Sequence, residues 1–311
     1  MRVTFKGEDA ISLQSDLYEV VILPNRGAKI ASILYKPLKL ELLSQLPGKK
    51  YQSKPNPLHG FTSEDSTGFD DMFPSILAEE YIWDSGETTS IQDHGDVWYR
   101  AWECHSISPS ECLSSIELTD FSCLLEKSIK IHNHGIQVAY ALTNKSEAPF
   151  RGLWAAHALF AMRPGMFLEV NLPAVEIINA MENSALGENA FGKRYTYIIP
   201  SAAWEDVAVF NPNSRSCAKY YFSPSTVFSR CSIIDKQNSI AIHVDFDSEI
   251  TPYVGIWKNE KGWEGQMNIG IEPATSGMDA PSLAKEFGMG KVFPAHETTV
   301  WDLQISVEPT T

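Results

Sequence analysis

Residues 125–142 read LEKSIKIHNHGIQVAYAL, and this stretch decides the fold class. Its second half, 136–142, alternates large apolar residues with small or polar ones. A period of two is typical of a β-strand with one buried face. The first half, 125–131, provides a partner strand, and His132-Asn133-His134-Gly135 between them has the composition of a turn. The stretch therefore predicts an antiparallel β-hairpin.

Strand signals recur on both sides of this hairpin. Residues 18–23 and 28–35 flank the turn Pro24-Asn25-Arg26-Gly27, and the alternation returns at 301–307. The best short helix signal is 281–287, which starts with Pro and stops at Gly288. Many strands with turn-marked spacing predict an all-β fold, a large antiparallel β-sandwich with few short helices.

The sequence shows no feature that would divide the chain into domains. Its 311 residues, 43% of them hydrophobic, contain no Pro/Ser/Gly-rich linker, charge block or fixed-period repeat. We therefore expect a single domain over residues 1–311. The least patterned parts are 36–68 and 181–194, where we expect long loops, which in compact domains are often functional.

Charge and composition narrow the class of partner. The net charge of −14 repels nucleic-acid phosphates and anionic lipid headgroups, and no Lys/Arg cluster offsets it. The longest apolar stretch, 152–162, contains His157 and is too short to span a bilayer. The N-terminus lacks the apolar run of a signal peptide, and the five cysteines form no CxxC pair. We expect a cytoplasmic protein that binds neither nucleic acid nor membrane.

Three segments combine glycines, aromatic residues and ionisable residues in a way that a core strand does not require. They are 68–74 (GFDDMFP), 93–100 (DHGDVWYR) and 255–273, which contains Trp257, Gln266 and Glu272. Glycines let a backbone approach a ligand, carboxylates and amides bind hydroxyls, and indole rings stack on the C–H face of a sugar. This chemistry favours a neutral polyol as ligand.

The same segments carry a resemblance to a known family. GFDDMFP (68–74), DHGDVW (93–98), WAAHALF (154–160) and GIEP (270–273) follow one another in an order that resembles the galactose mutarotase-like (aldose 1-epimerase) superfamily. The closest likeness is to an epimerase-related branch rather than to the galactose mutarotases themselves. The resemblance implies a β-supersandwich and reversible opening of a hemiacetal sugar ring with no metal and no organic cofactor.

The resemblance also implies roles for three residues. Glu272 would take the proton from the anomeric hydroxyl, His157 would protonate the ring oxygen, and His94 would hydrogen-bond the sugar near that oxygen. Ring opening needs one proton to leave O1 while another reaches O5, which a carboxylate and an imidazolium can provide. The pKa values of both groups must lie near the working pH, because their roles reverse when the ring closes.

Further residues are candidates for sugar binding. The galactose mutarotases carry an aspartate that grips sugar hydroxyls, and Asp70 and Asp71, expected in a loop, are better candidates than Asp245 and Asp247 in a strand-like run.

Trp257 and Gln266 belong to the glycine-flanked third segment, whereas Trp98 and Trp263 are expected to serve in core or rim packing. Arg100 lies six residues beyond His94. Because related phosphosugar epimerases use arginines, an anionic sugar stays open, as does the identity of the sugar.

Two other classes of function remain open at this point. One is a carbohydrate-binding or sensing protein of the same fold without turnover, since fold does not fix function. The other is a metal-dependent lyase or isomerase with ligands among His94, His132, His134 and His157, although the HxH pair falls where a turn is expected. The sequence leaves open whether the chain is a monomer or a homodimer.

Overall fold

A computed structural model describes residues 1–48, 50–51, 54–63, 66–224 and 226–310, and most of its strands lie in two large antiparallel sheets. Within these ranges the larger sheet has twelve strands, in the spatial order β1 (Arg2–Phe5), β2 (Glu8–Gln14), β3 (Tyr18–Leu23), β4 (Lys29–Tyr35), β6 (Gly68–Met72), β14 (Ala155–Ala161), β22 (Met267–Ala274), β21 (Tyr253–Glu260), β18 (Cys217–Phe222), β16 (Ala174–Asn179) and β17 (Arg194–Ile198), with β5 (Leu40–Glu41) beside β4. The second sheet has eight described strands, in the order β15 (Phe167–Glu169), β19 (Arg230–Asp235), β20 (Ile240–Phe246), β24 (Thr298–Pro309), β12 (Gly135–Asn144), β11 (Cys123–His132), β10 (Glu111–Leu118) and β9 (Glu103–Ile107).

Smaller elements surround the two sheets. Two small sheets have two strands each: β7 (Glu79–Ile82) pairs with the next strand, β8 (Thr88–Ile91), and β13 (Phe150–Gly152) pairs with the distant β23 (Lys291–Phe293). The helices are α1 (Ala202–Ala208), α2 (Pro281–Glu286) and the 3-10 turns η1 (Lys36–Leu38), η2 (Pro57–His59) and η3 (Phe61–Ser63). The predicted all-β sandwich with few short helices is therefore confirmed.

The hairpin predicted from residues 125–142 forms as β11 and β12. The two strands pair in register from Cys123–Asn144 to His132–Gly135, and both alternate buried with less buried positions. Asn133 and His134 make the connection, as the turn composition predicts. The pattern was strong enough to define this hairpin because one face of each strand is buried against the other sheet.

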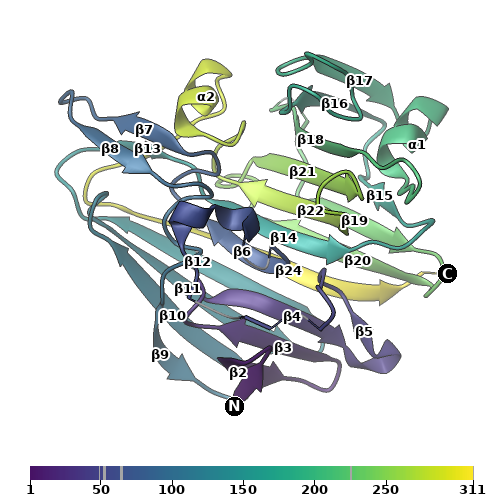
Figure 1. The fold of residues 1–311 in the computed structure, drawn as a ribbon, viewed down its shortest axis with the longest axis horizontal. Helices are drawn as coiled ribbons and strands as arrows, with labels where there is room; N and C mark the ends of the chain where they lie inside the picture. Colours follow the sequence, from purple (N-terminus) through teal and green to yellow (C-terminus); the bar gives the residue numbers. More distant parts are fainter. Residues whose placement is uncertain (49, 52–53, 64–65, 225, 311) are drawn as a thin grey trace.

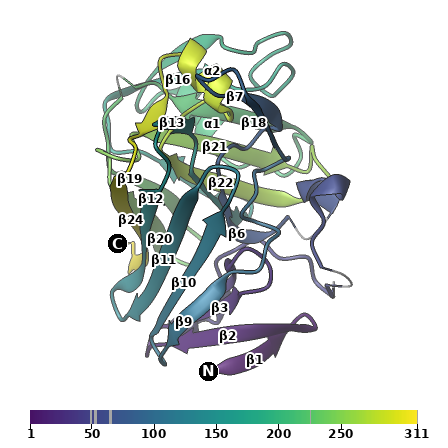
Figure 2. The same cartoon turned by 90° about the vertical axis from the view of Figure 1, so that its left-hand side faces the viewer.

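The two sheets lie face to face around a shared apolar core (Figures 1 and 2). Ile129 and Val138 of the smaller sheet and Ile30, Phe160 and Ile256 of the larger sheet all belong to this one core cluster. Burial of such side chains contributes about 25 cal/mol for each Å² removed from water. The opposite face of the larger sheet is thus left for other contacts.

Segments predicted as loops lie beside that opposite face. Residues 36–68 contain only η1, β5, η2 and η3 as regular elements, while positions 49, 52–53 and 64–65 lie outside the described residues. The short helical turns η2 and η3 lie over the sheet near β6 (Figure 1). Of residues 181–194, which lead from β16 to β17, only Arg194 belongs to a strand, as the first residue of β17. Among the described residues, the helices are too short or too polar to cross a membrane.

Candidate functional site

A row of side chains crosses five adjacent strands on the outer face of the larger sheet. It consists of Asp70 on β6, His157 on β14, Glu272 on β22, Gly255 on β21 and Tyr221 on β18. The strand register pairs His157 with Asp70, Glu272 with Gly255, and Gly255 with Tyr221. The register between β14 and β22, which pairs Ala158 with Ile271, places His157 opposite Glu272. Sheet pairing alone therefore brings these distant parts of the sequence together.

Two further rows lie parallel to the first on the same face, because side chains two residues apart on a strand share a face. One contains Leu159, Gly270, Trp257 and Lys219, and the next pairs Asn268 with Asn259. Together the rows place an imidazole, an ammonium, an indole and two amides on one surface. These are groups that recognise hydroxyls and the C–H face of a sugar.

A cleft of about 300 Å³ lies over this surface. Its floor includes His157, Lys219, Trp257, Asn259 and Asn268. Its walls come from loops: Phe61, Thr62, Ser66, Ile76, Leu77, His94, Ala180, Met181, Trp263, Gln266 and Asp279. Both segments expected to form functional loops, 36–68 and 181–194, thus contribute to the cleft.

Glu272 lies beneath the cleft floor, fully buried. Its Oε1 is 3.8 Å from Nε2 of His157 and accepts no hydrogen bond from the part of the chain that the structure describes, while its Oε2 accepts one from Nζ of Lys219. Space for the carboxylate comes from missing side chains: a Cβ at Gly270 would lie 2.6 Å from Oε1, and one at Gly255 would lie 3.4 Å from Oε2. The two glycines therefore allow Glu272 to reach across β21 to Lys219.

Burial shifts the two titratable groups in opposite directions. It raises the pKa of Glu272 above its ordinary value, and the ammonium of Lys219 offsets part of that increase. Burial also holds the pKa of His157 well below its ordinary value, with His94 and Lys219 adding to the decrease. The pKa of Glu272 is thus raised while that of His157 is lowered.

The imidazolium expected at His157 is consequently not its favoured form. Burial in a region that already holds Lys219 disfavours a second positive charge, so the neutral imidazole predominates.

His94 reaches the cleft from a tightly held loop. Gly95 has a φ of +79°, and a Cβ there would lie 2.3 Å from the carbonyl oxygen of Phe73, so only glycine fits. The carboxylate of Asp93 bonds Nδ1 of His94 at 2.8 Å and accepts a hydrogen bond from the backbone N–H of Phe61. The Phe61 ring stacks on His94 with centroids 4.2 Å apart. Asp93 and Phe61 thus fix the orientation of the imidazole.

The structure separates the two aspartates that the sequence analysis treats together. They lie in strand β6, which corrects the expectation of a loop, and neighbouring residues on a strand point to opposite faces. Asp70 lies on the His157 face but pairs with Lys29 at 2.9 Å, outside the cleft lining. Asp71 points into the core, where it pairs with Lys127 at 2.7 Å.

The remaining predicted residues fall into two places. His94, His157, Trp257 and Gln266 line the cleft, with Glu272 beneath them. Arg100 instead lines a separate surface hollow with Asp96, Tyr99, Leu118, Thr119, Asp120 and Phe121. Arg100 is not among the described residues that line the cleft, so it is not placed to contact a phosphate bound there.

Sequence reasoning missed several polar residues of the site. They are Lys219, Tyr221, Asn259, Asn268 and Asp279. A signal existed for Lys219, since it is the one charged residue in the strand CAKYYF (217–222). Asp279 is the aspartate that does line the cleft, although it was not among the candidates. Trp263, expected in packing, lies at the cleft and is 46% exposed.

The described residues contain no group of three or more His, Cys, Asp or Glu placed to hold a metal ion. His132 ends β11 and His134 lies in the adjoining turn, while His94 and His157 belong to the cleft. The set of histidines considered for a metal centre is thus divided between two parts of the molecule.

Sequence comparison with models of protein families gives no match, and comparison with curated protein sequences gives none either. The fold, by contrast, is that of galactose mutarotase-like proteins. Structures similar to this chain include the Slr1438 protein from Synechocystis sp. PCC 6803, with 14% identity, 99% of each chain covered and a TM-score of 0.74.

Two other similar structures carry names that describe the fold family. One is a galactose mutarotase related enzyme from Lactobacillus acidophilus, with 14% identity, 97% of this chain and 98% of that chain covered, and a TM-score of 0.71. The other is a galactose mutarotase-like protein from Clostridium acetobutylicum, with 13% identity, coverage of 100% and 98%, and a TM-score of 0.72. At 13–14% sequence identity, the similarity to these structures shows that the fold is shared and shows nothing further.

Proposed function

We propose that this chain is an aldose 1-epimerase, which interconverts the α and β anomers of a sugar by acid–base opening of the hemiacetal ring. The observation that carries the proposal is the placement of Glu272 opposite His157, 3.8 Å apart, under a cleft lined by amides and indoles. The fold shared with galactose mutarotase-like proteins supports the same class of reaction.

The proposed reaction transfers two protons and breaks one bond. Oε1 of Glu272 takes the proton of the anomeric hydroxyl, the C1–O5 bond breaks, and O5 takes a proton from His157, which leaves an open-chain aldehyde. Rotation about C1–C2 and reversal of both transfers close the ring as the other anomer. The pair begins and ends with one proton, and each transfer is typically worth ~10²–10⁴-fold in rate.

The cleft supports binding of a sugar above this pair. Gln266 and Asn268 offer amide groups, and Oδ1 of Asn268 is buried without a hydrogen-bond partner among the described residues. The amide of Asn259 bonds the backbone of Trp263 and so holds that indole at the cleft. Trp257 and Trp263 offer indole surface for the C–H face of the ring. In the proposed complex the anomeric hydroxyl reaches Oε1 of Glu272 beside His157, which requires a movement of the side chains that cover the carboxylate.

The proposal is tested by NMR exchange spectroscopy of anomeric protons on a panel of neutral aldoses, uronic acids and sugar phosphates. We expect faster α/β exchange for at least one sugar, abolished in Glu272→Gln and reduced ~10²–10⁴-fold in His157→Asn. Circular dichroism confirms that both variants stay folded. Near-wild-type exchange in Glu272→Gln on a confirmed substrate would show that the base is misassigned.

A second candidate is a carbohydrate-binding protein of this fold without turnover. The observation that favours it is the complete burial of Glu272 and its bond to Lys219, which keep the carboxylate covered. Line broadening of a sugar by the protein with no faster exchange across the panel would support this candidate against the enzyme.

A further inference from the structure

We propose that Lys219 and Asp279 are positioning residues for Glu272. Lys219 holds Oε2, so that Oε1 is the oxygen left to accept a proton, and the opposite charges of Lys219 and Asp279 set the pH range in which the Glu272–His157 pair works. This inference rests on the proposed function, in which Glu272 is the base.

The contacts define a connected polar group below and beside the cleft. Nζ of Lys219 donates to Oε2 of Glu272 and lies 3.5 Å from Oδ1 of Asp279. The hydroxyl of Tyr221 donates to that same Oδ1 at 2.5 Å. All four side chains are buried, so each contact acts with little screening by water. The ammonium thus bridges two carboxylates, and the phenol fixes the second one.

The charged and titratable groups around Glu272 come from several elements. They are Lys219 and the phenol of Tyr221 from β18, His157 from β14, His94 from the loop after Asp93, and Asp279 from the loop before α2. The ammonium of Lys219 lowers the pKa of both Glu272 and His157, and Lys29 of β4, which pairs with Asp70, also lowers the pKa of His157. Asp279 raises the pKa of Glu272. The two residues therefore act on the pair with opposite signs.

Two isosteric or near-isosteric variants separate these effects. Lys219→Met removes a positive charge, so both members of the pair hold protons more tightly and the whole activity profile moves to higher pH. Asp279→Asn keeps an acceptor for Tyr221 and Lys219 but removes a negative charge, so the profile moves to lower pH. At the wild-type optimum, we expect Lys219→Met to lose up to ~10²-fold in exchange rate, the lower end of a general base contribution.

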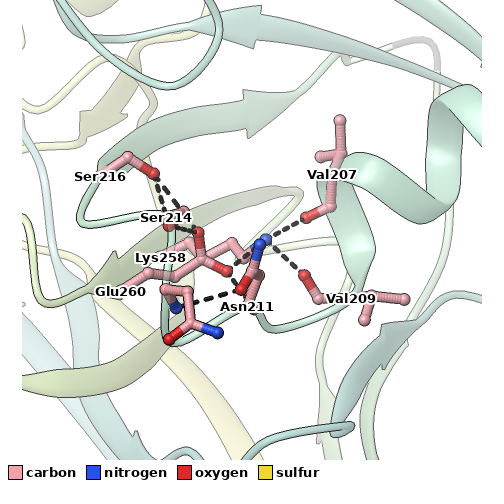
Figure 3. A network of polar contacts seen from close by, with 8 residues as sticks. Val207, Val209, Asn211, Ser214, Ser216, Lys258 and Glu260 are labelled. Carbon is pink, nitrogen blue, oxygen red and sulfur yellow. Dashed lines mark hydrogen bonds and ion pairs between the residues drawn. The ribbon is translucent and has the colours of Figure 1, made fainter.

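The chain provides a matched control on the other face of the same sheet. Lys258 of β21 is also buried, pairs with Glu260 at 3.0 Å, and donates to the carbonyl oxygens of Val207 and Val209 (Figure 3). Because its register partner is Ala218, its side chain points away from the face that carries Lys219. Lys258→Met removes a buried lysine of similar type without touching the cleft.

The experiment measures anomeric exchange against pH for the wild type, Lys219→Met, Asp279→Asn, Lys258→Met and Lys219→Arg. We expect opposite displacements in the first two variants, none in Lys258→Met, and a profile near that of the wild type in Lys219→Arg, which keeps the charge. Equal displacements in Lys219→Met and Lys258→Met, or displacements of the same sign in Lys219→Met and Asp279→Asn, would overturn the inference.

A readout independent of turnover keeps the two proposals apart. The carboxyl ¹³C resonance of Glu272, assigned by its loss in Glu272→Gln, can be titrated in the same variants. An upward midpoint shift in Lys219→Met and a downward shift in Asp279→Asn are expected. Such shifts without exchange in the wild type would refute the proposed function and leave the electrostatic role standing. Exchange without such shifts would refute the role of Lys219 and Asp279 alone.

Discussion

Nε2 of His157 and Oε1 of Glu272 face each other at 3.8 Å, although the residues belong to segments more than a hundred positions apart. The distance is longer than a hydrogen bond, so neither atom satisfies the other. Both side chains are buried, and the pKa of Glu272 is raised while that of His157 is lowered. A titratable pair of this kind marks a candidate functional site rather than a structural ion pair.

The pH dependence of the wild type is the first prediction. The pair works only when it carries one proton, so kcat/KM for anomer exchange should pass through a maximum between about pH 4 and 9. Activity should fall at low pH, where the Glu272–His157 pair takes up a second proton, and at high pH, where the pair loses its only proton. Because burial lowers the pKa of His157, the acid limb should lie below that of an ordinary histidine. A flat profile on a confirmed substrate would contradict this scheme.

Gly270→Ala should damage the site while the chain still folds. A Cβ there would lie 2.6 Å from Oε1 of Glu272, and the carboxylate cannot simply swing aside because Lys219 holds its other oxygen. The same Cβ would lie 3.1 Å from Cβ of Trp257, so a lower thermal midpoint is expected as well. We expect exchange to fall ~10²-fold or more, as for a lost general base, in a variant that circular dichroism shows to be folded. Gly290→Ala is the control, since the nearest atom to its added Cβ would be 3.6 Å away. Equal, near-wild-type rates in both variants would mean that Oε1 is not the reacting atom.

Arg100→Ala should leave anomeric exchange unchanged for neutral sugars and for sugar phosphates. Arg100 lines a surface hollow with Asp96 and Asp120, outside the cleft that holds His157. The measurement is the same NMR exchange experiment on both classes of sugar. A selective loss with phosphorylated sugars would place the phosphate at Arg100 and would require a different mode of binding.

Loss of the lysine from the interior ion pair between the sheets should lower the unfolding free energy more than loss of the lysine from a surface pair. Lys127 and Asp71 are fully buried, and Trp154 donates to the second oxygen of Asp71. Lys127→Met alone should cost about 3–5 kcal/mol of unfolding free energy, because it leaves a carboxylate buried without its counter-ion. The double variant Lys127→Met/Asp71→Leu should recover much of this loss, since no charge remains buried.

Urea denaturation gives these free energies, and the exposed pair Lys145–Glu117 supplies the reference. Lys145→Met should change the unfolding free energy by no more than about 1 kcal/mol. A loss in Lys127→Met as small as that of the surface variant would show that the interior pair contributes little to stability.

The sequence by itself determined the sandwich and located most of the residues proposed for the chemistry. Alternation in 136–142 fixed the β11–β12 hairpin because one face of each strand is buried, and local patterns of this kind need no knowledge of distant residues. The motifs around His94, His157, Trp257 and Glu272 were also visible, and the structure brings these residues to one cleft or directly beneath it.

Only the tertiary structure decided which charged groups belong to the site. Asp70 and Asp71 are neighbours in sequence, but the strand sends one to the outer face and the other into the core. Lys219 and Asp279 lie in segments without a recognised motif. Lys219 meets Glu272 because β18 lies two strands from β22 and glycines leave the space between them open, and Asp279 joins the group through its contact with Lys219. Strand order, register and burial are long-range properties, so the local pattern of a sequence does not contain them.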